Sequence, residues 1–137
     1  MNRVSLIFSI LYACFFWVAC QLEETATPQK ASIVGNWKCY SRFLGYQNGG
    51  DFQWHNLEQE RQFLLKFRSD STYTADAYGN PISINGRYFL TDTLLTTYST
   101  SPVDGRTEIV HTLNDSVLIL KQFIDEGYTL DKFKRQD

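Results

Sequence analysis

Residues 63–77 read FLLKFRSDSTYTADA, and this stretch predicts two β-strands joined by a tight turn. Alternate residues of a strand share one face, so Phe63, Leu65 and Phe67 lie together while Lys66 lies on the opposite face. The second run, which follows the polar Ser-Asp-Ser turn, alternates in the same way. The chain is therefore expected to build its core from strands that bury one face.

The same alternation continues on both sides of this hairpin and predicts eight strands. β-branched and aromatic residues favour half-buried pleated surfaces, and they fill these runs between polar or glycine-containing turns. Asn85-Gly86 can turn a hairpin or bend one strand, and we favour the bend, because a split leaves too short a partner strand. The expected strands span about 34–43, 61–68, 71–77, 82–91, 93–99, 106–113, 116–122 and 127–134.

Consecutive strands at hairpin spacing predict an antiparallel meander. An open sheet of this kind would leave two edges exposed to association, and closure into a barrel removes both of them. We therefore predict an all-β fold, an eight-stranded antiparallel up-and-down barrel. The interior of such a barrel is just wide enough to pack side chains or to hold one small ligand.

Composition and motifs exclude several classes of function. The chain has 137 residues, a formal net charge of −2 at pH 7, and no basic patch of the kind that binds nucleic acid. It contains no phosphate-binding loop, zinc-ligand spacing or catalytic serine motif. Cys39 shares a face with Trp37, so we expect it to be buried, and no base in the sequence would activate it. We therefore expect no enzyme activity, no cofactor and no metal.

The orientation of His111 leaves two alternatives open. It alternates with Ile109, which we expect to face inward, and an inward imidazole would suit a haem iron or a ligand carboxylate. A hydrogen-bonded core histidine or an outward one is the more frequent outcome, and we favour that interpretation.

The N-terminal residues predict export from the cytoplasm. Residues 1–19 include the basic Arg3, an apolar run at 4–18 and the small Ala19, which is the pattern of a secretory signal peptide. The apolar run is shorter than the ~20 residues that a membrane span needs. We therefore favour cleavage over an uncleaved anchor.

Residues 18–20 read Val-Ala-Cys and resemble the lipobox of bacterial lipoproteins, with Trp17 standing where that box usually has Leu. The resemblance implies cleavage before Cys20 and acylation of its thiol, which anchors the protein to a membrane. A competing box at 11–14 would make Cys14 the acylated residue. That choice leaves an apolar stump on the mature chain, so we prefer Cys20.

A polar and acidic tether is expected to follow the anchor. Gln21 is not the aspartate that resembles an inner-membrane retention signal, which favours the outer membrane of the bacterial cell envelope, at its periplasmic or surface face. The expected organisation is a signal peptide at 1–19, a tether at 20–32, a barrel at 33–135 and a tail at 136–137.

Gly35-Asn36-Trp37 opens the first strand and resembles the Gly-x-Trp signature of the lipocalins. In that family the tryptophan closes one end of the barrel, and a basic residue after the last strand stacks over it. The resemblance therefore implies structural roles for Gly35, Trp37 and Arg135. The planar guanidinium of Arg135 suits a ring face better than the amine of Lys134.

Further segments are similar to strands of compact bacterial lipocalin-like domains, and they lie at 67–73, 86–88 and 114–120. The resemblance covers nearly all of 33–135. The sequence has no clear Thr-Asp-Tyr motif, no helix after the last strand and no disulfide, and these departures place it with the short bacterial members.

The resemblance implies that the barrel holds a small apolar or amphipathic ligand. The candidate ligand-binding residues on the strands are Phe63, Leu65, Phe67, Tyr73, Tyr88, Leu118 and Leu120. The longest non-strand segment, 44–59, adds Tyr46, Phe52 and Trp54 as a lid over the barrel mouth or a plug on its rim. The alternative is a plugged barrel that contacts an envelope protein and holds no small molecule.

Overall fold

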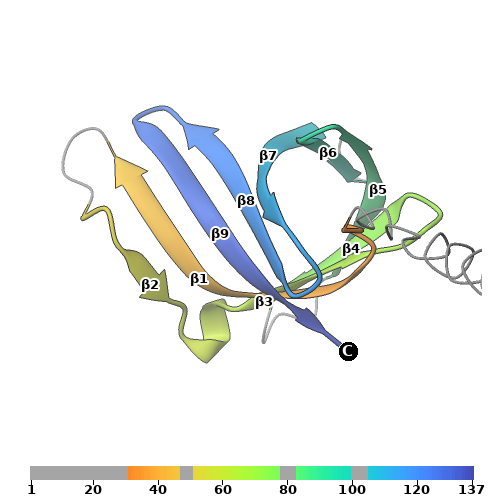
Figure 1. Cartoon of the computed structure of the whole chain (residues 1–137), viewed down its shortest axis with the longest axis horizontal. Coiled ribbons are helices and arrows are strands. Elements are labelled where there is room, and N and C mark those ends of the chain that lie inside the picture. Colours follow the sequence, from red (N-terminus) through yellow and green to blue (C-terminus); the bar gives the residue numbers. More distant parts are fainter. Residues whose placement is uncertain (1–30, 47–50, 78–82, 100–104) are drawn as a thin grey trace, which may run out of the picture. The chain divides into compact units, whose positions relative to one another are not determined.

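The structure of this chain is a computed structural model that describes residues 31–46, 51–77, 83–99 and 105–137 (Figure 1). These residues lie in one compact unit, Ala31–Asp137. The expected signal peptide, Cys14 and Cys20 fall outside the described residues. The elements of the folded unit are β1 (Gly35–Tyr46), β2 (Trp54–Asn56), the 3-10 turn η1 (Gln59–Arg61), β3 (Phe63–Phe67), β4 (Thr72–Ala77), β5 (Ser83–Thr91), β6 (Leu94–Ser99), β7 (Gly105–Leu113), β8 (Val117–Ile124) and β9 (Gly127–Gln136).

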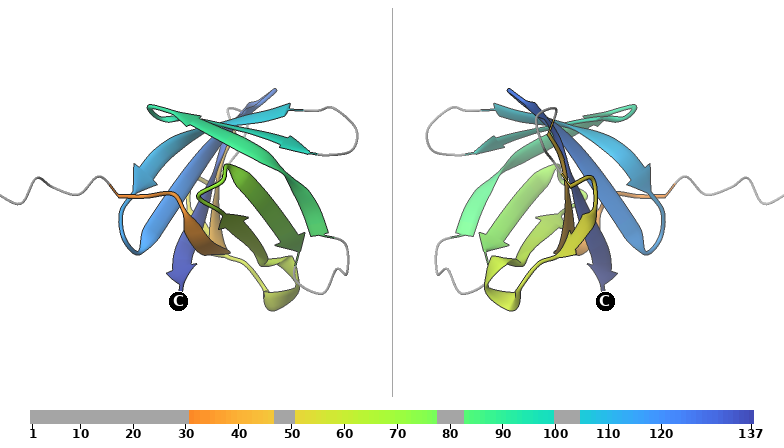
Figure 2. Two further views of the ribbon diagram at one scale, coloured as in Figure 1. Left: turned by 90° about the vertical axis from the view of Figure 1, so that its right-hand side faces the viewer. Right: turned by 90° about the vertical axis from the view of Figure 1, so that its left-hand side faces the viewer.

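The strands form one antiparallel sheet in the order β2-β1-β3-β4-β5-β6-β7-β8-β9, and β1 also pairs with β9. That pairing runs from Asn36↔Gln136 to Tyr46↔Gly127 and closes β1 and β3–β9 into an eight-stranded barrel. The predicted fold is confirmed, and Figure 2 shows the strands crossing obliquely around the interior. In this part of the chain, no helix is long and apolar enough to cross a membrane.

The bend at Asn85-Gly86 is confirmed, because β5 is one strand from Ser83 to Thr91. A Cβ on Gly86 would lie 1.9 Å from the carbonyl oxygen of Tyr98 and 2.6 Å from the ring of Tyr73. Glycine is therefore required by the close approach of its neighbours, as is common where a strand bends.

The segment 44–59 differs from the expectation of one long loop. β1 continues to Tyr46, and β2 pairs with it through Phe43↔Trp54. The glycine at 45 lets the ring of Tyr128 lie over the backbone, where a Cβ would be 2.7 Å away. Close packing across the β1–β9 pair therefore extends the strand through a residue that usually weakens one.

A four-stranded extension of the sheet, which we call the wing, lies beside the closed part of the barrel. β1 pairs with β3 only through Gly35–Lys38, and the register of β7 with β8 ends at Lys121. The second half of β1 therefore continues with β2, β9 and the end of β8. Figure 1 shows these four strands to the left of the ring formed by β4–β7. The wing comprises 41–46, 54–56, 121–124 and 127–130.

The two ends of the barrel differ in the side chains that close them. At the base, where β1 and β3 meet, Trp37 is fully buried and donates a 2.7 Å hydrogen bond from Nε1 to the carbonyl of Ile33. At the opposite end, the mouth, β4, β6 and β8 end and β5, β7 and β9 begin. The core between them contains the fully buried side chains Trp37, Cys39, Phe67, Leu95, Leu118, Leu120 and Phe133.

Two β-bulges, one at Tyr40 in β1 and one at His111 in β7, change which residues face inward. In β7, the register shifts between Val110 and Thr112, so that His111 is the extra residue and is exposed. Ile109 pairs with the exposed Leu94 on the outer face, whereas Glu108 and Val110 are buried. The expectation that Ile109 faces inward is therefore wrong, whereas the favoured interpretation of His111, which included an outward side chain, is confirmed. A bulge adds one residue to one strand and reverses the alternation beyond it.

Candidate functional site

The inner face of the barrel carries a cluster of four charged side chains and one amide, which we call the arginine cluster. It comprises Arg42 on β1, Arg106 and Glu108 on β7, Gln122 on β8 and Asp131 on β9. These strands bring together residues that are up to 89 positions apart in the chain. Charged groups inside a barrel are costly to bury unless they are paired, so their partners decide what the cluster can do.

Arg42 and Asp131 form a bidentate ion pair. The Nε of Arg42 lies 2.6 Å from Oδ1 of Asp131, and its Nη2 donates to Oδ2 at 2.8 Å. The Asp131 side chain is only 4% exposed, whereas that of Arg42 is 39% exposed. The carboxylate therefore lies in the wall, while the guanidinium remains open to solvent and has its pKa raised by the hydrogen bond with Asp131.

The bulge in β1 creates this pair. The register shifts between Cys39 and Ser41, so that Tyr40 is the extra residue and Arg42 stands opposite Asp131. Simple alternation from the buried Cys39 would have turned Arg42 to the outside. One inserted residue thus moves a guanidinium from the outer face to the inner face.

Arg106 holds the second buried carboxylate. Its Nη2 donates to Oε1 of Glu108 at 2.8 Å and to Oε1 of Gln122 at 2.8 Å. The side chain of Glu108 is 9% exposed and that of Arg106 is 49% exposed. Burial raises the pKa of Glu108 above its ordinary value, and the charge of Arg106 opposes that rise.

The chemistry of the cluster suits an anion. Each arginine offers up to five N–H donors in a planar fork that matches a carboxylate, sulfonate or phosphate. Within the described residues, Arg42 uses its Nε and Nη2 on Asp131, which leaves Nη1 to meet a ligand. The cluster is neutral when both carboxylates are ionised and gains one positive charge when Glu108 is protonated.

The interior on the base side of the cluster is filled by the protein itself. Fully buried aromatic and leucine side chains pack there, and Phe63 meets Phe133 edge to face with ring centroids 5.5 Å apart. Phe67 makes a similar contact with Tyr88 at 4.9 Å. The inner face becomes partly exposed on the mouth side of this packing, at Arg42 and Arg106.

The residues predicted to bind a ligand fall into three places. Phe67, Tyr73, Tyr88, Leu118 and Leu120 are buried in the core, and Phe63 and Leu65 pack against it. Tyr46 ends β1 on the same face as Arg42 and is partly buried. Phe52 and Trp54 are exposed and contact Phe43 on the outer face of the wing. Ligand binding by these ten residues stays a prediction.

Sequence reasoning did not identify the arginine cluster. Asp131 alternates with Phe133, which was a usable signal that a carboxylate faces inward near the end of the chain. Arg42 gave no such signal, because its inward direction depends on the bulge at Tyr40. The inward direction of Arg106 and Glu108 was missed for a similar reason, because Ile109 was assigned to the wrong face of β7.

Cys39 does not provide a reactive thiol. It is fully buried, and burial, with a smaller contribution from the charge of Asp131, raises the pKa of the thiol to about 12. A thiol of this kind stays protonated at neutral pH and is a poor nucleophile. Among the described residues, no group of three or more His, Cys, Asp or Glu side chains is placed to hold a metal ion.

Arg135 closes the base in the arrangement that the family resemblance implies. Its guanidinium carbon lies 4.2 Å from the ring centroid of Trp37. It also donates to the carbonyls of Asp115, Val34 and Ser32 at 2.7, 2.8 and 2.8 Å. Gly35 has a φ of 145°, and a Cβ there would lie 2.3 Å from Nη1 of Arg135, which explains the glycine of the motif.

Comparisons with known proteins place the fold. The sequence matches no known protein-family model, and no curated protein matches it. Two solved structures are similar. A lipocalin-like protein from Bacteroides uniformis is 16% identical, with a TM-score of 0.56 over 75% of this chain and 97% of that one. An uncharacterized protein from Bacteroides eggerthii is 15% identical, with a TM-score of 0.56 over 77% of this chain and 100% of that one. The chain therefore has the fold of a bacterial lipocalin-like domain.

Proposed function

We propose that this chain is a binding protein that holds the charged end of a small amphipathic anion at the arginine cluster. The observation that carries the proposal is the pair of buried carboxylates, each holding a half-exposed guanidinium on the inner face of the barrel. Positioned arginines of this kind are ready to bind an anion without a further ordering cost. The lipocalin-like fold supports binding, since folds of this kind typically bind rather than catalyse.

The packing of the interior supports a shallow site. Phe133, Leu118 and Leu120 are fully buried below the cluster, so the apolar part of the ligand lies against the partly exposed inner face near Leu44 and Tyr46. A ligand with one charged end and one apolar end fits this arrangement. A purely apolar molecule would leave both guanidiniums unused.

Two dyes that differ by one charge test the proposal. Anilinonaphthalene sulfonate carries a sulfonate, and N-phenyl-1-naphthylamine lacks it. For the protein without residues 1–20, with its strand structure first verified by circular dichroism, the sulfonate is expected to bind at least about tenfold tighter, since a charge-assisted hydrogen bond contributes roughly 1.5–3 kcal/mol.

A matched pair of variants locates that difference. Arg106→Gln is expected to remove most of the preference for the sulfonate and to leave the uncharged dye unchanged. Arg87→Gln makes the same charge change on the outer face of β5, where Arg87 is exposed and opposite Tyr98, and is expected to change neither dye. Equal affinity for both dyes in the unmodified protein, or equal effects of the two variants, contradicts the proposal.

A second candidate function follows from the filled core. A barrel whose base half is occupied by its own side chains also suits an accessory protein that uses its surface and holds no small molecule. This candidate predicts that neither dye binds inside the barrel. It also predicts a bare mass when the protein is purified from its own host and weighed by native mass spectrometry.

We also propose that the protein is attached to the outer membrane of a bacterial cell envelope through acyl chains on Cys20. The signal-like residues 1–19 and the Val-Ala-Cys sequence at 18–20 support this attachment. Two or three chains hold a protein stably on a bilayer, whereas one chain binds marginally. Cys20→Ala is expected to abolish labelling with palmitate, and labelling that persists would place the modification elsewhere, with Cys14 as the next candidate.

A further inference from the structure

Five aromatic rings lie on the outer face of the wing: one comes from each of its four strands, and the fifth is Phe52, which precedes β2. Phe43 on β1 lies at the centre of this group. Its ring centroid is 5.7 Å from Trp54 on β2, 6.0 Å from Tyr128 on β9 and 6.3 Å from Phe52. Phe123 on β8 pairs with Tyr128 and completes the row. The rings therefore form one continuous surface.

Much of this surface is open to solvent. The exposed fractions are 57% for Phe52, 42% for Trp54 and 63% for Phe123. Phe52 also has a φ of 50°, in the left-handed region that bulky residues rarely adopt. A contiguous exposed aromatic surface, part of it presented by a strained residue, indicates a contact that lies outside the folded unit.

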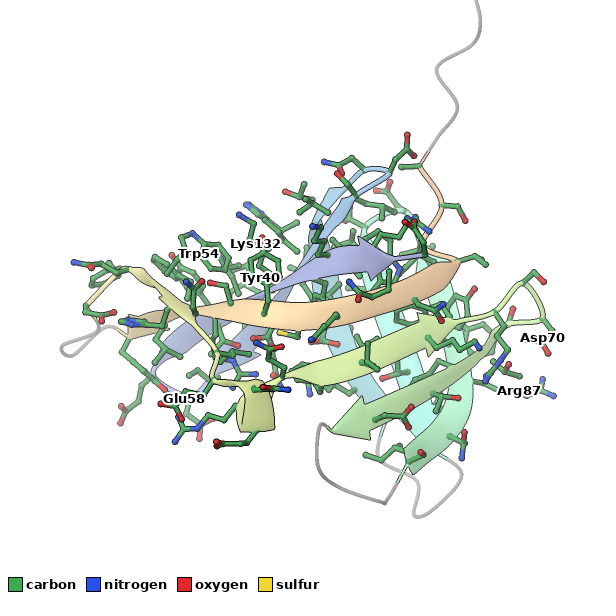
Figure 3. All side chains as sticks on the ribbon, turned by 90° about the horizontal axis from the view of Figure 1, so that it is seen from below. Tyr40, Trp54, Glu58, Asp70, Arg87 and Lys132 are labelled. Atoms are coloured by element: carbon green, nitrogen blue, oxygen red, sulfur yellow. The ribbon has the colours of Figure 1, made fainter. Side chains whose placement is uncertain are left out.

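Two lysines border the rings. Nζ of Lys121 lies 4.3 Å from the ring centroid of Tyr128 and 4.7 Å from that of Phe123. Nζ of Lys132 lies 5.5 Å from the ring centroid of Trp54 and 5.9 Å from that of Tyr40. Figure 3 shows Tyr40, Trp54 and Lys132 together on one side of β1. We call the five rings with these two lysines the aromatic–lysine face.

The combination of residue types distinguishes between partners. Protein–protein interfaces are enriched in aromatic residues but depleted in lysine. At a membrane–water interface, by contrast, aromatic rings lie at the level of the lipid headgroups, and lysines bind the lipid phosphates. Rings bordered by lysines therefore fit a lipid surface better than a protein surface.

We propose that the aromatic–lysine face lies on the surface of a lipid bilayer. The chain that precedes the folded unit supports this occupant, since it holds the apolar run at 4–18 and the cysteine expected to be acylated. Residues 21–30 can span at most about 35 Å. The distance along β1 from Gly35 to Phe43 is about 26 Å, so the face lies within reach of a bilayer at Cys20.

A tether also explains why so small a face suffices. Attachment at one point gives the second contact a high effective concentration, so a weak surface can stay bound. This part of the argument rests on the membrane attachment proposed above. The orientation of the barrel, with the aromatic–lysine face toward the lipid, is a separate claim.

The second exposed aromatic face of the barrel provides a control. On the outside of β5 and β6, Phe89 and Tyr98 meet edge to face at 5.9 Å and are 54% and 45% exposed. Among the described residues, no lysine is recorded over either ring. Phe89 is 54% exposed and Trp54 is 42% exposed, and Figure 1 shows β5 on the other side of the fold from the wing, so an indole at residue 89 serves as the control.

The fluorescence of Trp54 measures the proposed contact. The full chain with Trp17→Leu is purified as the cell processes it and is reconstituted into vesicles of brominated phosphatidylcholine and phosphatidylglycerol. Trp37 is fully buried and Trp54 is exposed, so about half of the total emission is expected to be quenched by bromine at the lipid interface. Adding Trp54→Phe is expected to abolish this quenching.

Adding Phe89→Trp to the chain that carries Trp17→Leu and Trp54→Phe moves the indole to the control face. This variant is expected to escape the brominated lipid and to remain open to iodide in the water. Flotation of the protein with the vesicles reports the anchor, and quenching reports the face. Flotation without quenching of Trp54, or equal quenching at residues 54 and 89, overturns the proposed contact of the aromatic–lysine face but not the attachment at Cys20. The absence of flotation overturns both proposals.

Discussion

β1 and β9 pair with each other from the base of the barrel to the wing, and an arginine near each end of this pair makes different contacts. At the base, Arg135 gives hydrogen bonds to three backbone carbonyls and stacks on the buried Trp37. Toward the mouth, Arg42 contacts one carboxylate and stays 39% exposed. Arg135 gives its donors to the fold, whereas the guanidinium of Arg42 stays partly open to solvent.

The aromatic residues of the two ends show the same contrast. Trp37 is buried beneath Arg135, whereas Trp54 is exposed beside Lys132 on the wing. A cation lies over the ring in both cases. Burial therefore decides the role. Trp37 with Arg135 stabilises the fold, whereas Trp54 with Lys132 forms part of an exposed surface.

The largest expected effect comes from replacing Trp37 with alanine, and Trp54→Ala is the matched comparison. Trp37→Ala removes a fully buried ring from the base and is expected to lower the free energy of unfolding by about 4 kcal/mol. Trp54→Ala removes a ring from the outer face and is expected to change it by less than about 0.5 kcal/mol. Urea unfolding followed by circular dichroism measures both. Equal losses would remove the distinction between base and wing.

Breaking the Arg42–Asp131 pair is the next largest effect. Arg42→Ala leaves the carboxylate of Asp131 buried without its partner, and removal of one partner of a buried pair costs about 3–5 kcal/mol. Because Arg42 is itself partly exposed, we expect a loss at the low end of that range. The double variant Arg42→Met with Asp131→Leu is expected to recover most of it. A double variant as unstable as the single one would show that the pair is needed for packing rather than charge balance.

The regular part of this fold could be predicted from the sequence, because alternation is a local property. Phe63, Leu65 and Phe67 share one face, and the turn residues around Asp70 and Asn114 mark where the strands reverse. Closure of the barrel followed from the number of strands and their short connections. These features depend on residues close together in the chain.

The arginine cluster could not be predicted in this way, since it depends on two bulges. The extra residues are Tyr40 in β1 and His111 in β7. The first shifts the register with β9, which is far away in the sequence, and the second shifts it with β8, the next strand along the chain. Alternation that is read along one strand passes through a bulge without detecting it. Arg42 was consequently assigned no inward role, although it faces the interior opposite Asp131.

Gly35 tests how closely the base is fitted. Its φ of 145° disfavours any side chain, and a Cβ would lie 2.3 Å from Nη1 of Arg135. Gly35→Ala is therefore expected to displace Arg135 from Trp37 and to lower the free energy of unfolding by about 2 kcal/mol. Gly105→Ala is the comparison, since its Cβ would lie 2.8 Å from the ring of Tyr98, which is 45% exposed and can move, and its φ lies outside the left-handed region. A larger loss at residue 105 would contradict the fitted base.

The smallest expected effect is a pH dependence from Glu108 on the mouth side. Arg106, Arg42 and Asp131 surround its carboxyl, and burial raises its pKa above the ordinary 4.5. A folded-state pKa above the unfolded value means that the folded protein binds the proton more tightly. The stabilisation is then fully present below pH 4.5 and is lost as the pH rises through the raised pKa.

Glu108→Gln isolates this contribution, because the amide resembles the protonated acid at every pH. The stability of the variant minus that of the unmodified protein is expected to be near zero at pH 4 and to grow toward pH 8, with a slope of at most about 1.4 kcal/mol per pH unit. Urea unfolding at each pH gives the difference, in which the titration of other groups cancels. A difference that shrinks as the pH rises would mean that Arg106 favours the ionised carboxylate more than burial opposes it. The arginine cluster would then be neutral at every working pH, and its attraction for an anion would rest on the geometry of Arg42 and Arg106 alone.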